Sequence, residues 1–259
     1  MSDSNTTLTT VFNGTPTRGQ IKKQEKEKEK CKLAVCAIIK QLDGRQGALT
    51  EGTGFLVEHL FPKFEKKRHI VTSEVVIPSD NLQGYFLCFK KSDSTDKEPL
   101  KLASVAADDI LRISGLVFIP LDPGKFGRFR RSRSGLLNHR AFTVWRKGIQ
   151  HQGLYCHVVE EHGTSHVVKP YQLLENENGQ HNLRAFRHDS SRKLLGAPIT
   201  TDVNGEAVAV GALCTCTFKE DKVSAVFFSQ FDSFNLATSS GRFILVYNLV
   251  ISLLHIHHQ

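Results

Sequence analysis

The stretch that decides the fold runs from Lys193 to Gly211 and reads KLLGAPITTDVNGEAVAVG. Gly196-Ala197-Pro198 predicts a tight turn, and a short strand follows it. Asn204-Gly205 is a preferred pair in two-residue β-hairpin turns, because both residues tolerate positive φ angles. Small and β-branched residues then alternate up to Gly211, as in a half-buried strand. The sequence therefore predicts a turn followed by a β-hairpin.

Strand-like segments continue from this hairpin in both directions. Each has four to eight apolar or β-branched residues and is bounded by turn signals, and convincing helical periods are few. The expected strands lie at residues 33–39, 52–57, 68–72, 84–90, 99–105 and 114–119, and then at 141–145, 153–159, 165–168, 182–186 and 223–228. This spacing predicts an all-β protein, built as antiparallel barrels or a sandwich.

Two charged stretches suggest how the strands are grouped. Residues 22–30 alternate Lys and Glu with no apolar face, which predicts a solvated helix or a disordered linker with no core to join. Residues 123–137 are rich in Gly and Arg and interrupt the strand pattern. The expected segments are a flexible charged arm (1–31), a first β-barrel (32–122), a basic connection (123–138), a second β-barrel (139–232) and a hydrophobic tail (233–259).

Composition is that of a soluble globular protein. The 259 residues are 40% hydrophobic and 23% charged, with a net charge of +8. This charge permits an anionic partner, although simple solubility explains it as well. The six cysteines are spread thinly, and the start lacks the apolar run of a secretory signal, so we expect an intracellular protein, cytoplasmic or nuclear, with reduced thiols.

No cofactor or metal site is predicted. Cys214 and Cys216 form a C-x-C on an expected strand, where both would face one side, but no second pair accompanies them. His157, His162 and His166, with His151 nearby, fit no standard ligand spacing and are expected at surface strand and loop positions.

Three motifs together resemble trypsin-like serine peptidases. Gly52-Thr-Gly-Phe-Leu-Val57 followed by His69-Ile-Val-Thr-Ser-Glu-Val-Val76 resembles the signature of the family's first barrel. Residues 107–122 resemble the strand that carries the family's aspartate, and 193–211 resembles its nucleophile hairpin. The lack of paired cysteines is closest to the intracellular, HtrA-like branch. The resemblance implies two packed antiparallel β-barrels, closed by a short C-terminal helix or an apolar tail.

The resemblance also implies that the catalytic triad is degenerate. The family's general-base histidine falls on Val75, its orienting aspartate on Ser114 and its nucleophilic serine on Leu195. Lys193 replaces an oxyanion-hole glycine, and Gly196 is retained. Acyl transfer in this family needs an oxygen nucleophile, an imidazole and a carboxylate. We therefore expect a catalytically inactive homologue that binds a protein or an extended peptide by β-augmentation between its barrels.

Two alternatives stay open. The first is an active serine endopeptidase with a misaligned or relocated triad, for which His188-Asp189-Ser190-Ser191 offers the residue types, although consecutive side chains point to alternate sides. His69 is expected to be a core or edge histidine, and Asp108 and Asp109 have no imidazole to orient. The weaker alternative is a polyanion-binding scaffold that uses Lys125, Arg128, Arg130, Arg131 and Arg133, next to Phe126 and Phe129.

The C-terminal end carries twelve mostly apolar residues, 243–254. A membrane-spanning helix needs about 20 such residues, so the stretch is short for that role. A helix packed on the second barrel or a partner-binding tail are the other expectations. The sequence gives no firm membrane or nucleic-acid signal.

Overall fold

The computed structural model describes residues 18–41, 48–58, 68–89, 100–103, 105–121, 140–145, 153–162, 165–175, 181–183, 191–219, 222–231, 234–239 and 242–247. The first half contains α1 (Arg18–Ala34), β1 (Val35–Gln41), β2 (Ala48–Glu58), β3 (Arg68–Ser73), β4 (Tyr85–Phe89), β5 (Leu100–Lys101), the 3-10 helix η2 (Ala107–Asp109), β6 (Leu111–Ile113) and β7 (Leu116–Leu121). The second half contains β8 (Phe142–Thr143), β9 (Leu154–His162), β10 (Ser165–Glu175), β11 (His181–Leu183), α2 (Ser191–Leu194), β12 (Pro198–Val203), β13 (Glu206–Lys219), β14 (Lys222–Gln230), β15 (Phe234–Ser239) and β16 (Arg242–Tyr247).

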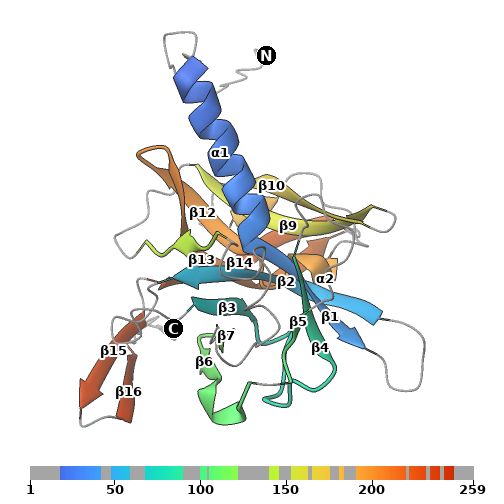
Figure 1. The fold of residues 1–259 in the computed structure, drawn as a ribbon, viewed down its shortest axis with the longest axis vertical. Helices are drawn as coiled ribbons and strands as arrows, with labels where there is room; N and C mark the ends of the chain where they lie inside the picture. Colours follow the sequence, from blue (N-terminus) through green and yellow to red (C-terminus); the bar gives the residue numbers. More distant parts are fainter. Residues whose placement is uncertain are drawn as a thin grey trace, which may run out of the picture.

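Most of the strands form two mainly antiparallel units that pack together (Figure 1), and β15 and β16 form a separate two-stranded sheet. The first is a curled sheet in the order β5-β4-β1-β2-β3-β7-β6. The second is a closed barrel in the order β10-β11-β14-β13-β12-β9. The predicted all-β fold of two packed, mainly antiparallel units is confirmed, with the second unit a closed barrel and the first a curled sheet. The division into five segments stays a prediction.

The hairpin that was predicted from residues 193–211 is present as β12 and β13. Its two turn residues, Asn204 and Gly205, have φ angles of 55° and 76°. The Gly205 amide donates a hydrogen bond of 2.7 Å to the Asp202 carboxylate, which fixes the turn. A two-residue turn with both φ angles positive matches the right-handed twist of the strands, so the local sequence dictates this element.

Aromatic side chains join the two units. Phe55 of β2 lies 6.0 Å from Phe142 of β8 and 6.4 Å from Phe231, measured between ring centroids, and Phe118 of β7 lies 6.4 Å from Phe231. All four rings are fully buried in one cluster, which also contains Val159 and Ala209 of the second unit. The expected strand at 141–145 therefore bridges the units. β8 pairs with β2 of the first sheet, and Trp145 donates a hydrogen bond to the Ala209 carbonyl.

Both ends of the chain differ from what the sequence led us to expect. Residues 18–34 form one helix that runs directly into β1 and rises from the body in Figure 1. The charged run at 22–30 was expected as a solvated helix or a disordered linker with no core to join; it is helical, and its last residue, Lys30, is buried. The C-terminal stretch, expected as a helix or tail, forms the hairpin β15–β16 over 234–247, and the rest of that stretch lies outside the described residues.

Not every strand assignment agrees in extent. The expected strand at 99–105 is reduced to the two residues of β5, and β6 was not predicted as a separate strand. Among the described residues, no helix is long and apolar enough to cross a membrane.

Candidate functional site

Two of the three sequence motifs, 52–76 and 193–211, meet at Thr53, at the centre of β2. Thr53 is fully buried, and its backbone amide donates a hydrogen bond of 2.9 Å to the Leu195 carbonyl. Its hydroxyl donates to the Lys193 carbonyl and lies 3.4 Å from the Val159 amide, which donates to it. Its own carbonyl accepts a bond of 2.9 Å from the Thr72 hydroxyl. One residue thus ties β2 to β3, to β9 and to the turn after α2.

Glycines flank Thr53 because its neighbours leave no room for a side chain. A Cβ on Gly52 would lie 2.4 Å from Val76 Cγ2 and 2.8 Å from the Leu195 carbonyl oxygen. The turn that carries Val75 and the turn that carries Leu195 therefore approach the same point of β2. This close packing is the physical reason for the glycine at position 52.

Gly196 closes the same junction from the other side. Its φ angle is +80°, and a Cβ there would lie 2.2 Å from both the Thr53 carbonyl oxygen and the Thr72 hydroxyl oxygen. Its amide donates a 2.8 Å hydrogen bond to the Leu213 carbonyl of β13. The turn that the sequence predicted at 196–198 is therefore pressed between β2, β3 and β13.

Leu195 fills space between the two units. Its side chain is half-buried and packs against the core of the first sheet and also against the core of the second barrel. An aliphatic side chain at this place supplies packing energy. It has no atom that can attack a carbonyl carbon or carry a proton.

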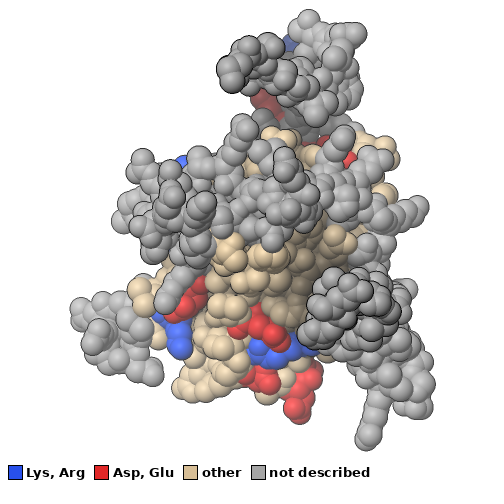
Figure 2. Space-filling view, turned by 180° about the vertical axis from the view of Figure 1, so that it is seen from behind, with Lys and Arg blue, Asp and Glu red and all other residues tan. Residues whose placement is uncertain are grey.

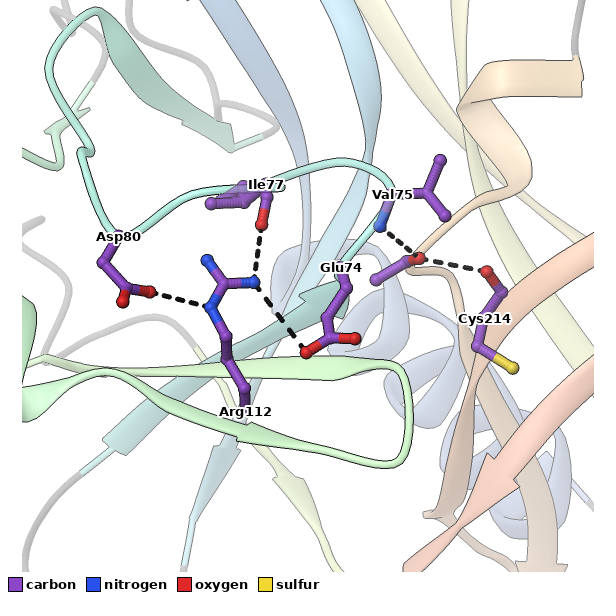
Figure 3. Close-up of polar contacts among 7 residues, drawn as sticks. Glu74, Val75, Ile77, Asp80, Arg112 and Cys214 are labelled. Carbon is purple, nitrogen blue, oxygen red and sulfur yellow. Dashed lines mark hydrogen bonds and ion pairs between the residues drawn. The ribbon is translucent and has the colours of Figure 1, made fainter.

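Val75 lies on the turn after β3, and its side chain is 62% exposed, the most exposed of the large apolar residues described. Its amide donates a 3.1 Å hydrogen bond to the Ser73 hydroxyl, and this hydroxyl donates a 3.0 Å bond to the Cys214 carbonyl (Figure 3). Ser73 is fully buried. The Ser73 hydroxyl therefore fixes the turn, because it bonds to the Val75 amide and to the Cys214 carbonyl.

Ser114 lies next to the same turn. With Gly115 it forms the two-residue turn between β6 and β7, with φ angles of 51° and 78°. The Gly115 carbonyl accepts a 2.9 Å hydrogen bond from the Glu74 amide, so this turn sits beside the residue before Val75. The Ser114 carbonyl accepts a bond from the Ser229 hydroxyl. The structure therefore brings the regions of Val75, Ser114 and Leu195 together.

Arg112 of β6 braces the turn from below (Figure 3). Its Nε donates a 2.7 Å hydrogen bond to the Asp80 carboxylate, and its Nη1 donates a 2.9 Å bond to the Ile77 carbonyl. Glu74 is more distant, with its Oε1 3.9 Å from Nη1. A planar guanidinium can make these bonds at once, which a lysine cannot do with the same geometry. No sequence motif singled out Arg112, Thr53 or Ser73 as a part of this site.

The described histidines and aspartates that were considered as acid–base groups do not form a catalytic arrangement. His157 was expected at the surface and is instead 7% exposed, because β9 turns it inward beside Phe142. Its Nε2 is 2.8 Å from the Thr200 hydroxyl, and burial lowers the pKa of its imidazole to about 4. His69 is buried in β3, as predicted, and Asp108 and Asp109 are exposed in η2.

Cys214 and Cys216 do not share one face. A register shift between Leu213 and Thr215 interrupts the alternation of β13. Cys214 packs against the cluster between the units, and Cys216 packs against the core of the second barrel. Within the described part of the chain, no group of three or more His, Cys, Asp or Glu residues is placed to hold a metal ion.

Two predicted sites lie outside the described residues. They are the basic stretch with Lys125, Arg128, Arg130, Arg131 and Arg133, and the His188-Asp189-Ser190 sequence. On the described part of the face seen in Figure 2, acidic and basic side chains lie next to one another in small groups.

Comparisons with known proteins give structural similarity only. No protein-family model matches the sequence, and no curated protein is significantly similar to it. A serine protease of a human pathogenic astrovirus is 15% identical, with a TM-score of 0.42, over 77% of this chain and 92% of its own. An HtrA-type protease solved with a decapeptide is 10% identical, with a TM-score of 0.44, over 79% and 63%. The active form of a protease from M. tuberculosis is 12% identical, with a TM-score of 0.43, over 86% and 90%. Similarity at this level says nothing about the chemistry of this chain.

Proposed function

We propose that this protein is a catalytically inactive homologue of the trypsin-like peptidases that works as a protein- or peptide-binding module. One observation carries the proposal. Two aliphatic side chains, Val75 and Leu195, stand on the two turns that converge on Gly52, where a general base and a nucleophile would be needed. Neither can bind or transfer a proton, and Leu195 is already used as packing between the two cores.

The surroundings of these residues support the loss of chemistry. Lys193, which replaces the expected oxyanion-hole glycine, has its carbonyl bonded to the Thr53 hydroxyl. The Leu195 carbonyl is bonded to the Thr53 amide. The segment before Gly196 is thus fixed to β2 through its carbonyl groups. A site that stabilises an oxyanion needs backbone amides aimed at the reacting oxygen instead.

A strand edge beside Val75 supports the binding role. β13 pairs with β12 up to Ala212 and with β14 up to Lys219. Among the described residues, the part of β13 at Thr215 and Cys216 therefore has a strand on one side only. An extended peptide can add to such an edge through main-chain hydrogen bonds. The exposed side chain of Val75 lies near this edge, because Ser73 links its amide to the Cys214 carbonyl.

An intracellular location fits the same proposal. All six cysteines are within the described residues and all are free thiols. Three of them are buried, and free thiols are usual in proteins of reducing compartments.

The binding role is tested with a library of extended peptides of eight to twelve residues, selected on the immobilised full-length chain. Val75→Asp places a charge on an exposed side chain, so the fold should tolerate it. Peptides that add to the β13 edge should lose affinity by about tenfold or more, because a desolvated charge would face them. Leu49→Asp, at another exposed apolar residue, is the matched control and should leave binding unchanged. Equal binding by both variants, or no selectable peptide, would contradict the role.

A further inference from the structure

The last turn of α1 is attached to the second barrel by charged groups. The Lys30 ammonium lies 2.5 Å from the Glu206 carboxylate, at the start of β13, and 3.7 Å from the Glu27 carboxylate. Lys30 is only 8% exposed, which is rare for a lysine. A buried ammonium group is stable only when an opposite charge pairs with it. The contact joins residues that are 176 positions apart in the chain.

A second contact lies on the same side of the helix. The Glu27 carboxylate accepts a 3.3 Å hydrogen bond from the Ala207 amide. Residues three apart share one face of a helix, so Glu27 and Lys30 approach the hairpin together. Two adjacent residues of β13, Glu206 and Ala207, therefore contact two side chains on one face of α1, those of Lys30 and Glu27.

The buried apolar side chains described on α1 are confined to its end. Among the described side chains of α1, only Cys31 and Ala34 are buried hydrophobic residues. Both lie within the last turn, directly before β1. The exposed side chains further up the helix are charged: Arg18, Lys22, Glu25, Lys26 and Glu29. Figure 1 shows this part of α1 standing away from the barrels.

We propose that the end of α1 is an electrostatic latch, closed by Lys30 on Glu206 and by Glu27 on Ala207, which opens locally and uncovers Cys31 while the barrels stay folded. The Glu206 side chain is half-exposed, so dissolved ions can compete for it. The latch does not depend on the proposed binding function.

Cys31 reports the state of the latch. In the closed state its thiol is 4% exposed, and burial together with the nearby Glu27 charge raises its pKa to about 12. A thiol in this state is unreactive, because the thiolate is the nucleophile. Opening removes the burial, which is the larger of the two effects, so the rate of Cys31 alkylation follows the population of the open state.

The test is the rate of alkylation of Cys31 by iodoacetamide in the full-length chain, followed by peptide mass spectrometry. Cys156, fully buried inside the second barrel, is measured in the same samples as a reporter of global unfolding. Glu206→Gln removes the charge that faces Lys30. Glu29→Gln is the matched control, because Glu29 pairs with Lys32 at 3.5 Å within the helix and does not reach the barrel.

Glu206→Gln should raise the Cys31 rate by about tenfold or more, since a buried ammonium loses the nearer of its two carboxylate partners, with the Cys156 rate unchanged. Added salt should raise the Cys31 rate of the unmodified chain and have less effect on Glu206→Gln. The exchanged pair Lys30→Glu with Glu206→Lys should restore slow alkylation. The latch proposal would be wrong if Cys31 were alkylated at the same rate in Glu206→Gln and in Glu29→Gln. It would also be wrong if the alkylation rate of Cys156 rose in parallel with that of Cys31.

Discussion

At the scale of single residues, Gly196 is the position that tolerates least change. Its φ angle of +80° disfavours any other residue, and its missing Cβ would lie 2.2 Å from two oxygen atoms. We expect Gly196→Ala to lower the free energy of unfolding by roughly 3 kcal/mol, from the left-handed conformation and the overlap together. Urea denaturation measures this loss directly.

Gly153→Ala separates the two causes. Gly153 has a similar φ angle of +78°, but nothing lies within 4 Å of its missing Cβ. Its replacement should therefore cost only the conformational part, about 1 kcal/mol. If both variants lose the same stability, the tight junction of Gly196 with Thr53 and Thr72 is not present in solution.

His157 makes stability depend on pH. Burial lowers the pKa of its imidazole from 6.5 to about 4, so the folded state holds it neutral. The unfolded chain takes up a proton as the pH falls through 6.5, and the folded chain does so only near pH 4. The free energy of unfolding therefore keeps its full value above pH 6.5. It decreases by about 3 kcal/mol in total as the pH falls from 6.5 to 4.

His157→Gln tests this prediction, because an amide can still bond to the Thr200 hydroxyl and does not titrate. Unfolding free energies of both proteins are measured by urea denaturation between pH 7.5 and 4. The difference between them should narrow as the pH falls, with the carboxylate groups contributing equally to both curves. Parallel curves would show that the imidazole is not held neutral.

At the scale of elements, the turn from Glu74 to Asp80 depends on a residue of another hairpin. Arg112 bonds to the Asp80 carboxylate and to the Ile77 carbonyl. The amides of Val76 and Ile77 both donate to the Ser73 carbonyl, at 3.0 and 3.2 Å. Arg112→Met should loosen this turn, and hydrogen exchange at these two amides should become about tenfold faster, which reports local opening.

Lys101→Met is the control for charge removal. Lys101 is exposed on β5, where its ammonium lies 5.9 Å from the centroid of the Phe86 ring. Its loss should leave exchange at Val76 and Ile77 unchanged. Equal exchange in Arg112→Met and the unmodified chain would mean that the guanidinium does not brace the turn.

At the scale of the whole molecule, local signals predicted the strands well. Asn204-Gly205 fixes its hairpin within four residues, so the prediction needed no distant contact. The last turn of α1 could not be predicted, because its partner Glu206 is far away in the chain. The strand β16 was expected as helix or tail because an apolar run alone does not distinguish a strand from a helix.

The site shows the same limit. The positions of Val75, Ser114 and Leu195 came from the order of three motifs, and the structure brings these regions together. What joins them is polar and distant in sequence: Thr53 bonds across 140 residues to Lys193, and Ser73 across 141 residues to Cys214. The sequence around a buried Ser or Thr does not indicate which distant group its hydroxyl bonds to. The three site positions could therefore be predicted, and the hydrogen bonds that join them could not.

The most direct test of the central claim, that this chain has no peptidase chemistry, is the intact mass of the full-length chain after incubation with a serine-directed fluorophosphonate. Leu195 offers no hydroxyl, and the Ser73 hydroxyl is buried and bonded on both sides. We predict an unchanged mass, with active trypsin as the positive control fully labelled in parallel. A stoichiometric adduct on any serine of this chain would contradict the account.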